Sequence, residues 1–359
     1  MLVHLVAAAR PNFVKIAPLY RELAAAPWCE AALIHPGQHY DFQMSQAFFR
    51  DLELPAPDFH LGVGSGSHAQ QTGRVLMAYE EVLVAERPDW VVVAGDVNAT
   101  LACTLAAKKL NLRVAHVEAG LRSFDRSMPE ELNRVLTDAV ADLLWTPSPD
   151  ADENLRREGV RPAAVVRVGN LMIDSLERLR EPIARARAWE PRGLRPGAYG
   201  VVTMHRPSNV DQPATFRTIL AALAQVAGRL PLVFPVHPRT RARLAEFGLT
   251  APPGLRLSEP AGYLEFLSLV AAARLVITDS GGLQEETTHL GVPCLTLRTS
   301  TERPITVTQG TNRLVRPGDL AAAAAAALAA PLPGPVRLEL WDGHAAERAA
   351  ASLRQAEGE

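Results

Sequence analysis

The composition of this 359-residue chain is that of a folded globular protein: 48% of the residues are hydrophobic and 21% are charged. A chain of this length divides most naturally into two domains of ordinary size. Its net charge of -2 argues against nucleic acid or an anionic membrane as a partner.

Neither the cysteines nor the N-terminus indicates an exported protein. The three cysteines lie far apart, and the absence of a CxxC pair or a Cys/His ligand spacing predicts neither disulfides nor a metal site. The apolar run that begins at Leu2 follows no basic segment, precedes no cleavage signal and is too short to cross a membrane. We therefore expect a cytoplasmic protein with no membrane partner.

Strands and helices alternate through the first half of the chain. The continuous apolar run Trp90–Ala94 is typical of a central parallel strand covered on both faces. Pro11 suits the first turn of a helix, whereas the Pro, Gly and Ser content of Leu54–Ser67 predicts a loop. The predicted strands are Leu2–Ala7, Ala31–His35, Trp90–Ala94, Arg113–Val117, Leu143–Thr146 and Val165–Val168, and the predicted helices are Pro11–Ala26, His68–Glu86, Thr100–Leu110, Pro129–Ala141 and Pro149–Gly159.

A segment rich in proline, glycine and arginine, Glu181–Ala198, interrupts this alternation and predicts a domain boundary. The alternation then resumes, which predicts the α/β class with two doubly wound, Rossmann-like domains. We expect domains at residues 1–180 and 181–340, and a last helix within residues 341–359 that packs back on the first domain. The second set of predicted strands is Gly200–Met204, Leu232–Val236, Leu255–Leu257, Leu275–Thr278 and Cys294–Leu297.

Residues with chemical potential fall just after the predicted strands. Arg10 follows the first strand, Asp96 follows WVVVA, Glu118 follows VAHV, His205 follows VVTM and His237 follows LVFPV. Doubly wound folds bind ligands at the carboxyl ends of their strands. Two such domains facing each other would therefore share a ligand cleft.

The run from His116 to Arg134 places several acids and guanidinium groups within one loop and one helical turn. Carboxylates that share a cleft raise one another's pKa and can then donate protons at neutral pH. Asp96, Glu118 and Glu130 are therefore candidate acid–base residues. Two simpler roles stay open: Asp96 as a helix cap, and Glu130 as the i,i+4 partner of Arg134.

Arg10 and Lys15 flank the start of the first helix, where both can reach one phosphate or carboxylate. Lys15 is one of three lysines in a chain that otherwise uses arginine, which indicates that a compact ammonium is needed there. The alternative for this pair is a solvated helix face.

Ser280-Gly281-Gly282 joins a predicted strand to a helix and predicts an anion site. The two glycines let a phosphate approach backbone N–H groups at the positive end of the helix. Glu285 and Glu286 follow in the first turn, where a carboxylate can accept both hydroxyls of a ribose or simply complement the helix dipole.

Histidines follow two strands of the second half. His205 can donate a hydrogen bond to a diphosphate and become charged as a leaving group develops. His237 repeats the pattern and is a weaker candidate for the same ligand. A half-buried histidine with satisfied hydrogen bonds is the alternative for either.

These motifs closely resemble those of the non-hydrolysing UDP-N-acetylglucosamine 2-epimerases. The resemblance covers nearly the whole chain and rests on ARPNFVKIAP, PGQHYD, AGDVNAT, HVEAGLRS, MPEELNR, VGNLMIDSL, TMHRPSNV, PVHPRT, TDSGGLQEE and TERPITVTQGTN. It implies two Rossmann-like domains in a glycosyltransferase-B arrangement, usually in a homodimer. It also implies that a UDP-sugar is held mainly by the second domain and that no metal or redox cofactor is needed.

The resemblance assigns roles to individual positions. Asp96, Glu118 and Glu130 match the family's catalytic acids, and His205 matches its active-site histidine. The positions that match basic, phosphate-binding and ribose-binding residues are Arg10, Lys15, Arg134, Ser280, Gly281, Gly282 and Glu286.

Two segments depart from the family pattern. Gln43 and Gln46 match part of an allosteric site for a second UDP-N-acetylglucosamine, but the arginine of that site is not evident here. Activation by substrate therefore stays open. Ser208 stands where many relatives have glutamate, so the contacts made at that position also stay open.

The implied reaction interconverts UDP-GlcNAc and UDP-ManNAc by eliminating UDP to a 2-acetamidoglucal intermediate and adding it back. Three alternatives stay open: a hydrolysing 2-epimerase that releases ManNAc and UDP, an epimerase of a modified UDP-HexNAc, and a glycosyltransferase of the same two-domain shape. The sequence does not decide which carboxylate is the base and which is the acid.

Overall fold

The computed structural model describes residues 1–37 and 48–358, and the chain divides into two compact units. Unit 1 comprises Met1–Arg178 and Glu339–Glu359, and unit 2 comprises Leu179–Leu338. The chain therefore passes from one unit to the other twice.

Unit 1 is built on a seven-stranded sheet with the order β3-β2-β1-β4-β5-β6-β7, in which every paired strand is parallel. The order reverses between β1 and β4, which is the position where doubly wound sheets bind ligands. The strands are β1 Leu2–Val6, β2 Glu30–His35, β3 Phe59–His60, β4 Trp90–Ala94, β5 Arg113–Val117, β6 Leu143–Thr146 and β7 Val165–Arg167.

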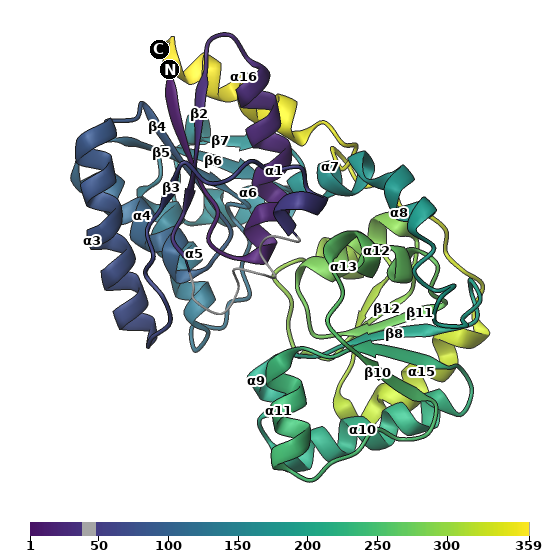
Figure 1. Cartoon of the computed structure of the whole chain (residues 1–359). Helices are drawn as coiled ribbons and strands as arrows, with labels where there is room; N and C mark the ends of the chain where they lie inside the picture. Colours follow the sequence, from purple (N-terminus) through teal and green to yellow (C-terminus); the bar gives the residue numbers. More distant parts are fainter. Residues whose placement is uncertain (38–47, 359) are drawn as a thin grey trace. The chain divides into compact units, whose positions relative to one another are not determined.

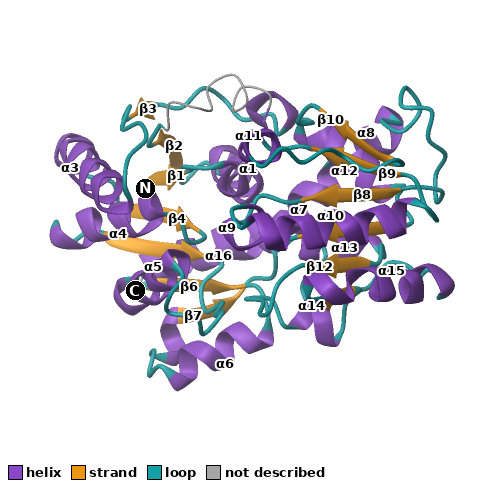
Figure 2. Ribbon diagram, turned by 90° about the horizontal axis from the view of Figure 1, so that it is seen from below, coloured by secondary structure: helices purple, strands orange, loops and turns teal. Residues whose placement is uncertain are grey.

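Helices cover both faces of this sheet. α3, α4 and α5 pack side by side on one face, and α1 packs with α7 and α16 on the other (Figure 2). Every residue of β4 is buried, in keeping with its continuous apolar sequence. The helices of unit 1 are α1 Arg10–Ala25, α3 His68–Glu86, α4 Asn98–Lys109, α5 Pro129–Val140, α6 Pro149–Arg157, α7 Leu171–Arg178 and α16 Ala345–Glu357, with a 3-10 turn at Pro162–Ala164.

One predicted loop contains a short strand. Phe59 and His60 form β3, which pairs with Ile34 and His35 of β2 at the edge of the sheet. A strand of two residues is too short to show an alternating pattern, so the prediction of a loop throughout Leu54–Ser67 was wrong at these positions.

The C-terminal helix α16 belongs to unit 1 and lies beside α1 (Figure 1). Asp174 of α7 accepts the backbone N–H groups of Ala345 (3.1 Å) and Ala346 (2.7 Å), and so caps the first turn of α16 from another helix. Burial raises the pKa of Asp174 to about 6, although those N–H groups oppose the shift. The indole of Trp145 in β6 donates to Ser352 of α16 at 2.8 Å.

Unit 2 repeats the architecture with a six-stranded sheet, β10-β9-β8-β11-β12-β13, whose paired strands are all parallel. Its order reverses between β8 and β11. The strands are β8 Gly200–Thr203, β9 Leu232–Pro235, β10 Leu255–Ser258, β11 Leu275–Thr278, β12 Cys294–Thr296 and β13 Asn312–Leu314. The helices are α8 Arg180–Ala186, α9 Pro207–Val210, α10 Pro213–Ala227, α11 Pro238–Glu246, α12 Tyr263–Ala271, α13 Gly282–Leu290, α14 Ile305–Thr308 and α15 Leu320–Ala329, with a 3-10 turn at Pro317–Asp319.

Strand β13 was not predicted. It completes the sheet by pairing Asn312–Leu314 with Cys294–Thr296 of β12. Its sequence, Asn-Arg-Leu, has a single apolar residue and so carries no strand pattern.

The predicted fold class, two doubly wound α/β domains, is confirmed by the two parallel sheets. Throughout residues 1–37 and 48–358, no helix is both long and apolar enough to cross a bilayer. Cys29, Cys103 and Cys294 are free thiols.

Candidate functional site

The carboxyl ends of β4 and β5 and the first helix of unit 1 bring together a buried pair of opposite charges. The ammonium of Lys15, on α1, forms an ion pair with the carboxylate of Glu118, directly after β5. Only 4% of Lys15 and 8% of Glu118 are exposed, so the solvated-face alternative for Lys15 is wrong. Asn12, one turn earlier on α1, donates to the carbonyl of Ala94 at 2.7 Å and fixes the helix against β4.

The backbone at both strand ends adopts the left-handed conformation. Gly95 has φ +66°, and a Cβ at this position would lie 3.3 Å from Lys15 Nζ and 3.4 Å from Glu118 Oε2. Glu118 itself has φ +68°, a conformation that costs a non-glycine residue about 1–3 kcal/mol and is enriched at functional sites. The ion pair therefore lies against the turn that leads into Asp96.

Asp96 is held by an arginine and does not cap a helix. Arg134, on α5, forms an ion pair with the Asp96 carboxylate. The next helix, α4, begins at Asn98 without a side-chain cap, so the capping alternative for Asp96 is wrong. Asn133 adds a hydrogen bond to the Asp96 carbonyl at 2.8 Å. Two acids, from the ends of β4 and β5, are thus each paired with a separate cation.

Glu130 and Glu131 differ although they are neighbours in the first turn of α5. Glu131 is buried and accepts hydrogen bonds from the backbone N–H groups of Ser123 (2.9 Å) and Phe124 (2.8 Å) and from Arg134 Nη1 (2.7 Å). It orders the loop after β5, a role that the sequence had not assigned to it. Glu130 is half-buried, one helical turn from Arg134, and its catalytic role stays a prediction.

In unit 2, His205 follows β8 and contacts a buried carboxylate that follows β11. His205 Nδ1 lies 3.0 Å from Asp279 Oδ1, with the histidine side chain 46% exposed and Asp279 0% exposed. The same carboxylate accepts the backbone N–H of Arg206 (2.9 Å) and the amide of Asn209 (3.1 Å). Burial raises the pKa of Asp279, but His205 and these donors outweigh burial and hold it below its usual value. An ionised Asp279 therefore orients the exposed imidazole, a role that the predictions had not given to it.

The predicted anion site lies at the start of α13, which begins at Gly282 after the N-cap residue Gly281. A Cβ at Gly281 would lie 2.8 Å from Nη1 of Arg303, so a guanidinium lies directly beside this helix terminus. Arg303 is buried and its Nε lies 2.8 Å from Glu285 Oε2. A cation that was absent from the predictions therefore lies beside the N-terminus of α13, where it pairs with Glu285 and lies 3.4 Å from Glu302.

Glu286 is a buried residue of the same helix, with only 4% of the residue exposed. Its carboxyl accepts a hydrogen bond of 2.9 Å from the hydroxyl of Tyr263 on α12. Burial raises the pKa of Glu286 to about 8, and the charge of Glu285 adds to the increase.

We expect Glu286 to make the protein less stable as the pH rises. Its pKa in the folded protein is about 8, against an ordinary value of 4.5. Between these values the folded chain keeps a proton that the unfolded chain has lost. The contribution of Glu286 to the free energy of unfolding is therefore fully present below pH 4.5 and declines up to pH 8. We therefore compare the free energy of unfolding of Glu286→Gln with that of the parent. The difference should shift in favour of the variant by roughly 2 kcal/mol when the pH is raised from 6 to 8.5.

Urea titrations at the two pH values measure this difference. Glu265→Gln is the matched control, because this carboxyl lies on the helix of Tyr263 but is 45% exposed. A Glu286→Gln variant whose stability stays parallel to that of the parent would contradict the raised pKa.

Three remaining predictions have different outcomes. His237 is the N-cap of α11 and accepts the backbone N–H of Arg239 at 3.2 Å, while its ring lies 6.0 Å from that of His205. Arg10 is the first residue of α1, and its binding role stays a prediction. Gln43 and Gln46 lie outside the described residues.

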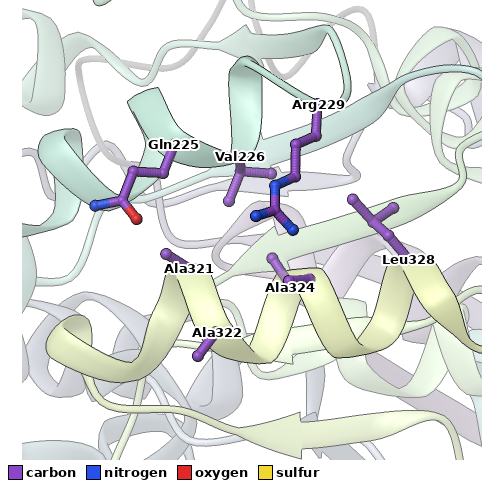
Figure 3. Close-up of a pocket in the computed structure, with 8 residues that line it drawn as sticks. Gln225, Val226, Arg229, Ala321, Ala322, Ala324 and Leu328 are labelled. Carbon is purple, nitrogen blue, oxygen red and sulfur yellow. The ribbon is translucent and has the colours of Figure 1, made fainter.

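A separate hollow of about 220 Å³ lies between α10 and α15 (Figure 3). The end of α10 leads into the amino end of β9, so this hollow lies near the amino ends of the strands. His205 follows the carboxyl end of β8, on the opposite side of the sheet. Its lining is formed by Gln225, Val226, Arg229, Ala321, Ala322, Ala324, Ala325 and Leu328. Within the described ranges, no three His, Cys, Asp or Glu side chains gather in a way that could hold a metal ion.

Comparison with known proteins gives concordant matches along the chain. The sequence model of the UDP-N-acetylglucosamine 2-epimerase family matches residues 21–354. The UDP-N-acetylglucosamine 2-epimerase of Methanocaldococcus jannaschii is 43% identical over 324 residues, covering 88% of each chain. The UDP-2,3-diacetamido-2,3-dideoxy-D-glucuronate 2-epimerase of Pseudomonas aeruginosa is 42% identical over 311 residues, covering 86% of each chain.

A solved structure matches almost the entire chain. The crystal structure of the Methanocaldococcus jannaschii UDP-GlcNAc 2-epimerase in complex with UDP-GlcNAc and UDP superposes with a TM-score of 0.92 at 40% identity, covering 99% of this chain and 100% of that chain. On the strength of the family match and these relatives, this chain belongs to the UDP-N-acetylglucosamine 2-epimerase family.

Proposed function

We propose that this protein inverts C2 of a UDP-linked 2-acetamido sugar and interconverts UDP-GlcNAc and UDP-ManNAc without releasing free sugar. The observation that carries the proposal is the pair of acids at the ligand-binding edge of unit 1. Glu118 is held by Lys15 and Asp96 by Arg134. Membership of the epimerase family supports the same reaction.

The first half of the reaction is an elimination. C2–H has no neighbouring carbonyl to acidify it, but it becomes removable as the C1–O bond to the β-phosphate breaks and C1 gains cationic character. The electrons of the C1–O bond leave with UDP, the C2–H electrons form the C1–C2 double bond, and the proton passes to a carboxylate. The products of this step are 2-acetamidoglucal and UDP.

The second half reverses the elimination with the opposite stereochemistry at C2. A carboxylic acid delivers a proton to the other face of C2 while an oxygen of the UDP β-phosphate adds to C1. This requires acid–base groups on both faces of the sugar. Glu118 and Asp96 suit that requirement because they arise from different strands and are fixed by different cations.

Unit 2 supplies the groups that suit the diphosphate and nucleoside. The N-terminus of α13 provides positive potential for the departing UDP, and the guanidinium of Arg303 beside it can donate hydrogen bonds to phosphate oxygens. His205, oriented by Asp279, offers a half-exposed imidazole that can donate a hydrogen bond to a phosphate oxygen. Glu286 is our candidate for the ribose contact.

A second substrate has support from one comparison. The Pseudomonas aeruginosa relative, whose name specifies a 2,3-diacetamido glucuronate, is nearly as similar in sequence as the Methanocaldococcus jannaschii enzyme. The sugar substituents at C3 and C6 are therefore the part of the substrate that assays must decide.

Product analysis tests the proposal. Purified protein incubated with UDP-GlcNAc should produce UDP-ManNAc, and the total of the two UDP-sugars should stay constant. UDP and ManNAc accumulating in equal amounts would instead show a hydrolysing epimerase. A parallel series with UDP-2,3-diacetamido-2,3-dideoxy-D-glucuronate compares kcat/KM for the two sugars, and the larger value identifies the preferred substrate.

A further inference from the structure

Four ionisable side chains contact one another in a row from the core of unit 1 to its surface: His116, Asp138, Arg122 and Glu158. His116 Nδ1 lies 2.6 Å from Asp138 Oδ1, and Arg122 Nη1 lies 2.7 Å from Asp138 Oδ2. Arg122 continues to Glu158 at 2.6 Å. The exposed fraction is 0% for His116, 2% for Asp138 and 3% for Arg122, whereas the Glu158 side chain is 37% exposed.

The partners of the His116 ring determine which nitrogen donates to the turn before Asp96. Its Nε2 lies 2.8 Å from the carbonyl oxygen of Gly95, and its Nδ1 faces the carboxylate of Asp138. A carbonyl oxygen can only accept. Nε2 must therefore carry a hydrogen, because an unprotonated Nε2 would place a buried lone pair against that oxygen.

Several partners surround the carboxylate of Asp138. Burial raises the pKa of Asp138, but His116, Arg122 and the Gly120 N–H outweigh burial, so the pKa lies below its usual value. Asp138 therefore accepts from Arg122 and Gly120 as an ionised carboxylate.

Asp138 and His116 hold the backbone on both sides of Glu118 and directly before Asp96. Asp138 contacts His116, two residues before Glu118, and accepts the N–H of Gly120 at 3.0 Å, two residues after it. It thus clamps the segment in which Glu118 adopts φ +68°. His116 in turn holds the carbonyl of Gly95, the residue before Asp96.

We propose that Asp138 and His116 are positioning residues that fix the backbone turns presenting Glu118 and Asp96. The ring of His116 links the carboxylate of Asp138 to the carbonyl of Gly95. The proposal rests on the proposed function in assigning proton transfer to Glu118 and Asp96.

Nitrogen NMR of the intact protein tests the contact of His116 with Gly95 without any substrate. In the protein with ¹⁵N-labelled histidine, we expect Nε2 of His116 to carry a proton, because its partner is the carbonyl oxygen of Gly95. An unprotonated Nε2 on His116 would overturn the proposal.

Kinetics test the positioning role. Asp138→Asn keeps the shape of the side chain and removes its charge, so we expect kcat to fall about 10- to 100-fold, with KM and UDP affinity within about twofold of the parent. The matched control is Asp142→Asn. Asp142 also accepts an N–H of β5, that of Val114 at 2.8 Å, and pairs with Lys108 at 2.7 Å, but at the amino end of the strand.

The control variant should keep the parent kcat. Equal losses in the two variants, or an unchanged kcat in Asp138→Asn, would overturn the positioning role. If Asp138→Asn does not fold, the NMR measurement on the parent protein decides. If the parent protein does not convert UDP-sugars, the proposed function fails while the NMR result still tests the contact of His116 with Gly95.

Discussion

Replacing Glu118 by glutamine is expected to lower turnover of a UDP-sugar by about a thousandfold while UDP binding persists, since general acid–base groups contribute on the order of 10²–10⁴ in rate. Glutamine preserves the size of the side chain but cannot take a proton. It also leaves Lys15, whose side chain is 5% exposed, without its counter-ion. Turnover and calorimetric titration with UDP measure the two properties separately.

The control for this variant is Glu153→Gln, which alters an arginine-paired carboxylate on α6 whose side chain is 38% exposed. It should retain turnover within about threefold of the parent, because partly exposed ion pairs contribute little. If Glu118→Gln lost turnover and UDP binding to the same degree, Glu118 would have a structural role and not a catalytic one.

Gly120→Ala is expected to destabilise the protein by at least about 3 kcal/mol, the largest stability effect that we predict. The backbone at Gly120 has φ +79°, and a Cβ there would lie 2.4 Å from the carbonyl oxygen of Ala151. That oxygen belongs to the backbone of α6 and cannot rotate away as a side chain could. The substitution should also disturb the hydrogen bond from Gly120 to Asp138 and lower turnover.

Gly159→Ala separates the clash from the backbone strain. Gly159 has φ +81°, but a Cβ there would meet nothing within 4 Å, so the variant should lose only about 1–2 kcal/mol, the cost of a left-handed conformation. Urea unfolding of the two variants gives both values. Equal losses would show that the contact with Ala151 is relieved at no cost.

The strands that position the site were predictable because their residues are largely apolar. Trp90–Ala94, Arg113–Val117, Leu143–Thr146 and Leu275–Thr278 have the predicted bounds, and all but the second are followed directly by glycine, proline or aspartate, residues typical of turns. The failures, β3 and β13, are short edge strands formed through pairing with a neighbour.

The candidate site was predictable only in part, for a similar reason. Strand ends indicated where Asp96 and Glu118 lie in the fold. The partners of these acids come from positions distant in the chain, such as Arg134 for Asp96. Asp138 lies in the last turns of an ordinary amphipathic helix, and its contacts with His116 and Gly120 form only when the helix packs on the sheet. No local pattern marks such a residue.

The position of deuterium after reaction in heavy water tests the central claim most directly. Protein incubated with UDP-GlcNAc in D₂O should yield UDP-sugars that carry deuterium at C2, with the bond to UDP intact in the recovered material. That result requires removal of the C2 proton and its return from solvent-exchanged acids. Conversion to UDP-ManNAc with the original hydrogen retained at C2, or no conversion and no exchange, would contradict the account.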